Sequence, residues 1–367
     1  MSTTTLRAAL LLPASLFAWA GAADAGTYCD PVNVDYCVSY TVIESAGDGD
    51  GYPEPNETIS LTPTFINRGS NTFTSLTGTM PGATPTSVTF PGVGPAGSTT
   101  ANGAFSYTIS PAAACGTDLT LSLFIDVSGI RISEMNIPVK VGSPGASQTF
   151  AYTGPVVAIP DAGSAVTAAV DVSGMSGGLF GARLLIDGAD CTTAVGATTV
   201  GIDHTQVGDL RLRLLAPIPT SGGTTAFTVA NRVGGSGNNF CQTRIGPAGS
   251  AAASIADVTA SDAPFSSDYY TSALDVLYGI SPNGTWQLEV RDYAAGETGS
   301  LRAFSLEMTP AVCDAPASGG GGGTIAGGGG DGGGTAPPGV LLVLLLVSLR
   351  HRNVRGVASR LQGRHSG

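Results

Sequence analysis

One stretch near the end of the chain decides the fold, and it reads NGTWQLEVRDYAAGETGSL at residues 283–301. Within it Trp286, Leu288 and Val290 alternate with polar side chains, which is the pattern of a strand with one buried face. After an acidic loop that contains glycine, apolar side chains alternate again over residues 304–308. The pattern predicts a β-hairpin of two half-buried antiparallel strands.

A period of two recurs in other parts of the chain. Every second residue over 119–127 is leucine, isoleucine or valine. Residues 210–214 hold leucines that alternate with Arg211 and Arg213, which predicts that the leucines face inward and the arginines outward. Segments rich in Gly and Pro mark turns between the strands. Further strand candidates in the first part of the chain are residues 38–44, 58–67, 104–110 and 134–141.

Composition limits the class of protein. The chain has 367 residues, of which 12% are charged, and this length suffices for two sandwich domains with tails. Residues 26–318 contain ten Lys and Arg against 25 Asp and Glu, a net charge of about −15. Such a surface repels nucleic acid and anionic lipid and suits divalent cations. We therefore expect an all-β protein of two β-sandwich domains that has no nucleic-acid partner.

Four ordered segments carry a family resemblance. They are IPD at 159–161, HTQVGDL at 204–210, NRVGGSGNNF at 231–240 and the stretch at 283–301. Together they resemble the P domain, also called Homo B, that follows the catalytic domain of kexin- and furin-like proprotein convertases, which are subtilisin-type proteases. The resemblance implies a jelly-roll β-sandwich that stabilises or assists a partner catalytic domain, usually with help from calcium.

The chain departs from this family pattern in two places. Residues 173–198 carry Gly-rich extra material, and after Gln242-Thr243 the acidic residues usual in the family are replaced by RIGP at 244–247. The second change removes candidate cation ligands.

An acidic loop lies in the first part of the chain, and it reads GDGDGYPEPNET at residues 47–58. In this loop the chain resembles bacterial extracellular Ig-like modules, which implies an Ig-like β-sandwich. Its glycines let the backbone fold tightly, so its four carboxylates could surround a hard cation through oxygen ligands. The sequence leaves two interpretations open, a calcium site and a solvated acidic turn. The four acids are Asp48, Asp50, Glu54 and Glu57.

Four further acids stand in the P-domain-like part. Under the resemblance Asp209 precedes a core strand, and Asp292 and Glu297 bracket the last loop. For Asp161 two roles stay open, joining these three acids or shaping the entry turn. Gathered carboxylates raise one another's pKa unless a cation or an arginine neutralises them. Calcium ligation and hydrogen-bonded turn caps are the two hypotheses.

The cysteines indicate disulfides. Their number is even, their spacing is wide and they form no Cys-x-x-Cys motif, which argues against zinc. We expect Cys29 to pair with Cys37, since they lie close in sequence, and Cys191 with Cys241, since they fall in one domain. The six are Cys29, Cys37, Cys115, Cys191, Cys241 and Cys313.

Both ends of the sequence read as targeting segments. Residues 1–25 hold one cation, an apolar run and small residues, which predicts a cleavable export signal. Near the C-terminus a Gly-rich stretch precedes about eleven apolar residues and an arginine cluster. As a helix the apolar residues reach only about 16 Å, against roughly 30 Å of membrane hydrocarbon.

This order of segments resembles the GlyGly-CTERM sorting signals of Gram-negative bacteria. The resemblance implies transient membrane association until a rhomboid-type protease cuts the tail, with the cluster of arginines on the inside. A permanent anchor and an unstructured remnant are the alternatives.

The parts of a protease are missing from the sequence. A Ser-His-Asp triad needs a histidine to accept the serine proton, and within residues 26–318 the one histidine is His204. The P-domain resemblance gives it no general-base role, so we expect a structural strand residue. We expect no Gly-x-Ser-x-Gly nucleophile elbow and no subtilisin-type Gly-Thr-Ser loop, and the sequence contains no His-Glu-x-x-His. We expect no enzymatic activity.

These observations predict a secreted or cell-surface, noncatalytic protein that binds or stabilises a partner, with a subtilisin-like serine endopeptidase as the first candidate. Alternatives are a calcium-dependent adhesin or glycan-binding surface protein, and a relative of serine-type endopeptidases. Possible Ca²⁺ is the one cofactor. The expected parts are a signal peptide (1–25), an Ig-like sandwich (26–147), a P-domain-like jelly roll (148–313), a Gly-rich linker (314–339) and a sorting tail with a short hydrophobic helix (340–367).

Overall fold

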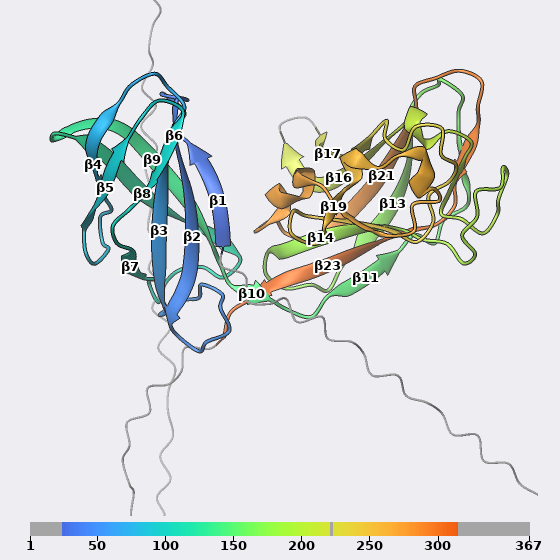
Figure 1. Cartoon of the computed structure of the whole chain (residues 1–367). Helices are drawn as coiled ribbons and strands as arrows, with labels where there is room; N and C mark the ends of the chain where they lie inside the picture. The colour runs from blue at the N-terminus through green and yellow to red at the C-terminus, as the bar shows by residue number, and fades with distance from the viewer. Residues whose placement is uncertain (1–23, 221–222, 315–367) are drawn as a thin grey trace, which may run out of the picture. The chain divides into compact units, whose positions relative to one another are not determined.

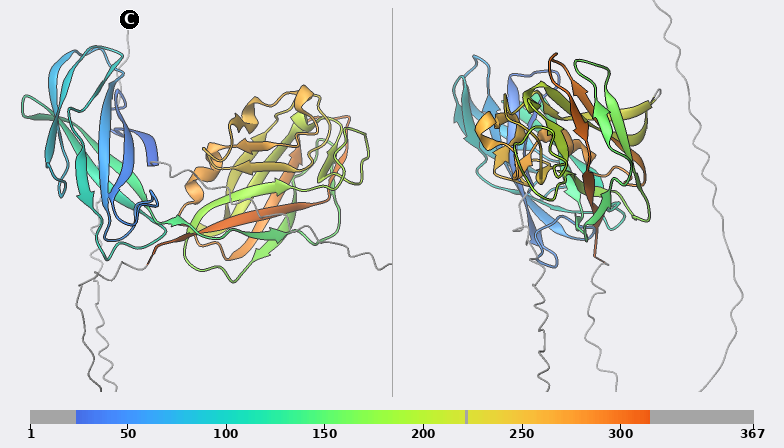
Figure 2. Two further views of the ribbon diagram at one scale, coloured as in Figure 1. Left: turned by 60° about the horizontal axis from the view of Figure 1, so that its bottom comes forward. Right: turned by 90° about the vertical axis from the view of Figure 1, so that its right-hand side faces the viewer.

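The computed structural model describes residues 24–220 and 223–314, and it is built almost wholly of β-strands (Figures 1 and 2). Two hydrophobic cores form, one from residues 36–139 and the other from residues 159–308. Each core lies within a β-sandwich, so the prediction of an all-β protein with two sandwiches is confirmed. The predicted export signal and the sorting tail lie almost wholly outside the described residues.

The N-terminal sandwich has two sheets. The first contains β1 (Asp24–Cys29), β2 (Tyr36–Ala46), β3 (Thr58–Asn67), β6 (Gly97–Thr100) and β7 (Phe105–Thr108). The second has the order β5 (Ser87–Val93), β4 (Phe73–Thr79), β8 (Thr117–Val127) and β9 (Ile130–Val141).

The alternation predicted for this sandwich is confirmed in its burial. In β3 Ile59, Leu61 and Phe65 are fully buried, while the residues between them are partly exposed. The sequence pattern missed β1, β4, β5 and β6. β4 and β6 are rich in Ser, Thr and Gly and carry few apolar side chains, whereas in β5 the alternation covers only Val88 and Phe90 before Pro91 and Gly92 interrupt it.

The C-terminal sandwich has two larger sheets and a small one. The first has the order β13 (Val166–Val172), β21 (Gly284–Asp292), β16 (Leu210–Thr220) and β17 (Gly223–Asn231). The second has the order β10 (Ser143–Pro144), β23 (Phe304–Val312), β14 (Leu179–Ile186), β18 (Thr243–Gly246), β20 (Asp268–Tyr270) and β19 (Ala253–Ser254), with β11 (Gln148–Ala151) also on β23. The small sheet is β12 (Val157–Ile159), β22 (Gly299–Leu301) and β15 (Ile202–His204).

Helical turns are few in the part of the chain that the structure describes. They are the 3₁₀ segments η1 (Val207–Asp209), η2 (Ile255–Asp257), η3 (Ala260–Asp262) and η4 (Ser272–Leu277). Within the same residues, no helix has both the length and the apolar character needed to cross a membrane.

The hairpin predicted from residues 283–308 is wrong. β21 pairs with β13 and β16, whereas β23 pairs with β10, β11 and β14, so the two strands lie in different sheets. The residues between them form β22 and cross from one sheet to the other. Alternation identifies a strand's buried face, and it does not identify the neighbouring strand.

The strands themselves are as the pattern predicted. Trp286 is fully buried and its indole N–H donates to the carbonyl oxygen of Pro282 at 2.7 Å. In β16 the three leucines at 210, 212 and 214 are buried, and Arg211 and Arg213 face outward. This amphipathic strand lies at the centre of the first sheet.

Three disulfides join the six cysteines. Cys29 pairs with Cys37 and Cys191 pairs with Cys241, which confirms both predicted bonds. The third bond joins Cys115, just before β8, to Cys313, just after β23, across 198 residues of sequence. It ties the strand that closes the C-terminal sandwich to the N-terminal sandwich covalently.

Candidate functional site

The acidic loop connects β2 to β3 and begins and ends on paired strands. Gly49 and Gly51 have φ angles of 88° and 89°, and Asn56 has a φ of 73°. Glycine adopts this left-handed region without the steric cost that other residues meet. The loop therefore turns tightly enough to bring its side chains back toward the end of β2.

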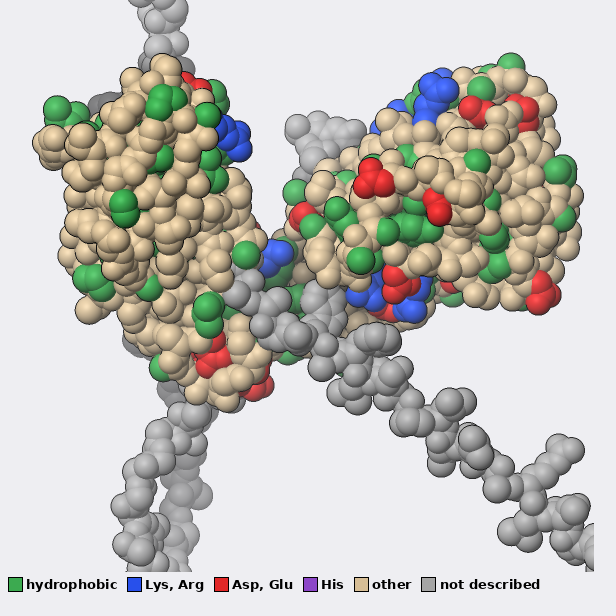
Figure 3. Space-filling view, viewed as in Figure 1, with side chains coloured by type: hydrophobic (Ala, Val, Ile, Leu, Met, Phe, Trp, Pro, Cys, Tyr) green, Lys and Arg blue, Asp and Glu red, His purple; other side chains and the backbone are tan. Residues whose placement is uncertain are grey.

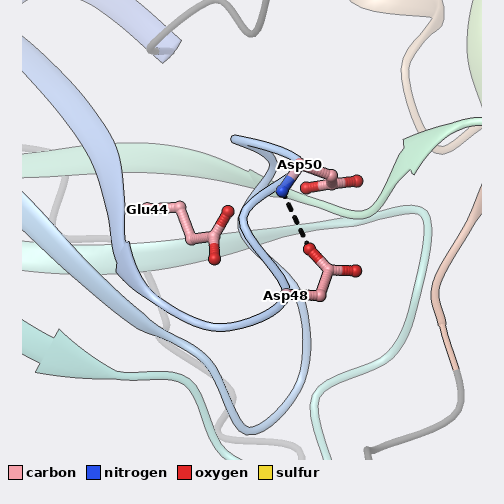
Figure 4. A group of neighbouring side chains, drawn as sticks. All are labelled: Glu44, Asp48 and Asp50. Atoms are coloured by element: carbon pink, nitrogen blue, oxygen red, sulfur yellow. Dashed lines mark hydrogen bonds between the residues drawn. The ribbon is translucent and has the colours of Figure 1, made fainter.

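Three carboxylates meet at this loop, those of Glu44, Asp48 and Asp50 (Figure 4). Each offers an oxygen, and these oxygens lie within 4.8 Å of one another. The backbone N–H of Asp50 donates to Asp48 Oδ1 at 2.9 Å, which fixes the turn between them.

Two glutamates hold the backbone of the loop through hydrogen bonds. Glu44 accepts the N–H groups of Gly49 at 2.9 Å and Gly51 at 2.7 Å. Glu57 accepts the N–H of Asp48 at 3.0 Å through one oxygen and that of Glu54 at 3.0 Å through the other. Glu57 therefore shapes the loop, and its oxygens fall in neither of the two carboxylate groups.

A second group shares Asp48 with the first and adds Glu54 and Asp314. Glu54 is only 3% exposed, and its carboxylate accepts the hydroxyl of Ser143 at 2.8 Å and the backbone N–H of Asp314 at 2.7 Å. The loop thus gathers acids from segments that are 260 residues apart in sequence.

The acids of this loop share an unfavourable electrostatic environment. Burial raises the pKa of Asp50 above its ordinary value, and repulsion from Asp48 and Glu44 raises it further. Burial also raises the pKa of Glu54 and of Glu57, again with contributions from neighbouring carboxylates. When these carboxylates are ionised, their negative charges repel one another.

This donor set fits a hard divalent cation. The ligands are oxygens only, and calcium takes carboxylate oxygens at about 2.3–2.6 Å in flexible geometry. A cation bonded to two oxygens at that range leaves them up to about 5 Å apart, which matches the observed grouping. Glu44, Asp48 and Asp50 would hold such an ion, with Glu54 and Asp314 beside them.

The four acids of the C-terminal sandwich have separate partners. Asp161 accepts the N–H of Gly296 at 2.9 Å, and Glu297 accepts the side-chain amide of Gln206 at 2.8 Å. The carboxylate of Asp209 lies 4.0 Å from Arg232, and that of Asp292 accepts the N–H of Ala294 at 3.0 Å. No three of these acids bring ligand atoms within 4.8 Å of one another in the described part of the chain. Their calcium ligation stays a prediction.

His204 is a buried strand residue. Its Nε2 lies 3.4 Å from Asp292 Oδ2, and both side chains are 0% exposed. The other ring nitrogen, Nδ1, lies 2.9 Å from the carbonyl oxygen of Gln206. The imidazole is therefore enclosed between a carboxylate and the backbone, where it cannot reach a substrate from solvent.

One serine pattern needs comment. Residues 174–178 read GMSGG and satisfy Gly-x-Ser-x-Gly, so the expectation that this string is absent is wrong. A nucleophile elbow turns from a strand into a helix, whereas these residues join β13 directly to β14. The string is a loop between two strands.

His204 and Asp292 are both fully buried in this sandwich. Residues 245–308 match the family model of the proprotein convertase P-domain. The P-domain match runs from β18 into β23 and contains Asp292 and Glu297, while His204, Asp209 and Asp161 precede it.

Two curated relatives are similar over 110 residues at 30% identity, both named calcium-dependent protease, from Trichormus variabilis and from Nostoc sp.. The similar segment is 30% of this chain and 13% of each relative, so the chain spans a small part of their length. A solved β-porphyranase of glycoside hydrolase family 86 from Bacteroides plebeius aligns over 76% of this chain and 37% of its own, at 7% identity and a TM-score of 0.22. A score that low supports no argument about fold or function.

The sequence pattern missed Glu44 and Asp314 as members of the acidic groups. Glu44 ends the alternating part of β2 just before the loop, and its position at the loop entrance was a usable signal. Asp314 follows Cys313, and nothing local in the sequence indicates its proximity to the loop. Only the fold brings it there.

Proposed function

We propose that this protein is exported and noncatalytic, and that its C-terminal sandwich binds and stabilises a subtilisin-type serine endopeptidase supplied by a separate chain. The observation that carries the proposal is the enclosure of His204 within a sandwich whose residues 245–308 match the P-domain model. A base that accepts a serine proton must stand within hydrogen-bond reach of that serine. The fully buried imidazole has Asp292 and the Gln206 carbonyl as its neighbours.

Two further observations support the proposal. The relatives that share the similar segment are named as proteases, and the segment is 13% of their length. The three disulfides favour an oxidising compartment, where secreted proteases also work.

Affinity capture tests the proposed function. The full mature chain, carrying a tag, is incubated with culture medium from the organism that encodes it, and the retained proteins are labelled with a fluorophosphonate probe for active serine hydrolases. We expect a labelled serine endopeptidase that the tagged chain retains. The control is the same chain after reduction and alkylation in urea, which keeps the composition and loses the folded surface. Equal recovery with both samples, or no labelled protein with either, contradicts the proposal.

We further propose that the acidic loop binds calcium. The support is the gathering of Glu44, Asp48 and Asp50, their oxygen-only chemistry and the raised pKa of Asp50, which burial raises first and repulsion from the other two carboxylates raises further. A cation there would replace like-charge repulsion with attraction, and would join the entrance of the loop to its tip.

The pH dependence of this binding follows from the sign of the pKa shifts. The raised pKa values mean that the folded loop binds protons more tightly than the unfolded chain. Without metal, the contribution of these groups to stability is therefore highest below about pH 4 and falls as the pH rises through the raised values. Calcium should raise the melting temperature by about 5 °C near pH 7 when present in large excess over its Kd, and by almost nothing below about pH 4, where the carboxylates are protonated.

Thermal melts with calcium and with chelator measure this effect. Asp48→Asn removes the ligand that both groups share, so it should abolish the calcium shift and raise the melting temperature measured in chelator. Asp257→Asn, at an exposed acid of η2, is the matched control and should keep the full shift. An equal shift in Asp48→Asn and the control would rule out this site.

A further inference from the structure

A group of arginines lies on the outer face of the β13–β21–β16–β17 sheet. The arginine face comprises Arg211 and Arg213 on β16, Arg291 on β21, and the neighbouring Glu289 and Tyr293. Residues 26–318 contain ten Lys and Arg. Three of these ten lie on this small face, together with one acid. In Figure 3 basic side chains appear in only a few places on the visible surface. The arginine face is thus locally positive on a strongly acidic protein.

The register places two of these arginines against each other. Arg211 of β16 pairs directly with Arg291 of β21, and like charges directly opposite each other destabilise a sheet. The Nε atoms of both side chains are also buried without a hydrogen-bond partner in the protein, and an unsatisfied buried donor destabilises the folded chain. This arrangement is therefore poor for the stability of the free chain, as is common at functional sites.

Glu289 neutralises only part of the charge. It forms a two-point ion pair with Arg213, with Nε to Oε1 at 2.7 Å, and Arg211 lies 3.5 Å from the same Oε1. The guanidinium of Arg213 holds the pKa of Glu289 below its usual range, so this acid stays ionised. One carboxylate thus faces three guanidinium groups, which leaves Arg291 without an acidic partner among the ion pairs of the described residues.

Tyr293 orients the two opposed arginines. The guanidinium carbon of Arg291 lies 4.5 Å from the centre of its ring, and that of Arg211 lies 5.0 Å from it. Contacts of this kind attract a cation to the face of an aromatic ring. They hold both side chains over the sheet without removing their charge.

We propose that the arginine face is the docking surface for an Asp- and Glu-rich peptide segment of a partner protein. Its excess charge is complementary to carboxylates, and guanidinium groups bind carboxylates through two parallel hydrogen bonds. Arginine and tyrosine are also the side chains most enriched among the dominant contacts of protein interfaces. The carboxylates of an acidic segment lying across β16 and β21 would reduce the repulsion between Arg211 and Arg291. They would also neutralise the positive charge that Glu289 does not balance.

The arginine face bears on the proposed function only if the acidic segment belongs to the captured endopeptidase. Binding of an acidic peptide without capture of a protease would contradict the proposed function and support the arginine face as a docking surface. Capture of a protease that is unchanged when the arginines are replaced would support the proposed function and contradict the arginine face as its docking surface.

Fluorescence anisotropy tests the surface. The probe is a fluorescein-labelled decaglutamate peptide, titrated with the full mature chain at low salt. We expect saturable binding that weakens as salt rises, and that is at least about tenfold weaker in Arg211→Gln/Arg291→Gln. The control is Arg68→Gln/Arg131→Gln, which removes the same charge from the N-terminal sandwich and should bind as the unmodified chain does. Equal binding by both double variants overturns the proposal.

Two further readouts keep the test decisive. Inorganic polyphosphate replaces the peptide in a parallel titration, and binding of polyphosphate without binding of decaglutamate overturns the assignment to a peptide. The melting temperature of Arg291→Gln should equal or exceed that of the unmodified chain, because the substitution removes a like-charge pair. If the double variant does not fold, Arg291→Gln is titrated with the peptide instead, and it should also bind more weakly than the unmodified chain.

Discussion

His204→Ala is expected to lower the free energy of unfolding by about 3 kcal/mol, because truncating a fully buried ring opens a cavity in the core beside the buried side chain of Asp292. Both side chains are 0% exposed and their facing atoms are 3.4 Å apart. Urea unfolding followed by tryptophan fluorescence measures the loss, since Trp286 lies in the same core.

The double variant His204→Ala/Asp292→Ala is the control for this coupling. Each single variant leaves one buried polar side chain without its neighbour, whereas the double variant leaves neither, so its loss of stability should be smaller than the sum of the two single losses by more than about 1 kcal/mol. Additive losses, or a single loss below about 1 kcal/mol, would show that the contact does not stabilise the sandwich.

Replacing Cys115 and Cys313 by alanine is expected to remove about 5 kcal/mol in the chain-entropy account of disulfides, because the bond spans 198 residues. The matched control removes the bond between Cys29 and Cys37, which spans only 8 residues, and should cost about half as much. Urea midpoints from circular dichroism rank the two variants. The reverse order would show that local strain or residual structure, and not the length of the closed segment, sets the contribution.

The strands were predictable where one face is buried. In β3, β8 and β16 the apolar side chains alternate because the core lies on one side only, and a period of two appears directly in the sequence. The pairing of strands was not predictable in the same way. β21 and β23 follow each other closely and both alternate, yet each finds its partners among strands far away in sequence.

The candidate site was predictable in part for the same reason. Asp48 and Asp50 stand together in one Gly-rich loop, so local sequence indicates their proximity. Asp314 reaches Glu54 only because β23 ends there and the chain is tied by a disulfide. Likewise the opposition of Arg211 and Arg291 depends on the register of β16 against β21, which no local pattern encodes.

The central claim is that this chain acts by contact and does not cleave bonds itself. Fluorophosphonate labelling of the purified mature chain, alone and after capture from medium, tests that claim most directly. The account predicts no label at the mass of this chain, because the His204 imidazole is enclosed, and label on the retained endopeptidase. A label on the chain itself, lost in His204→Ala, would contradict it.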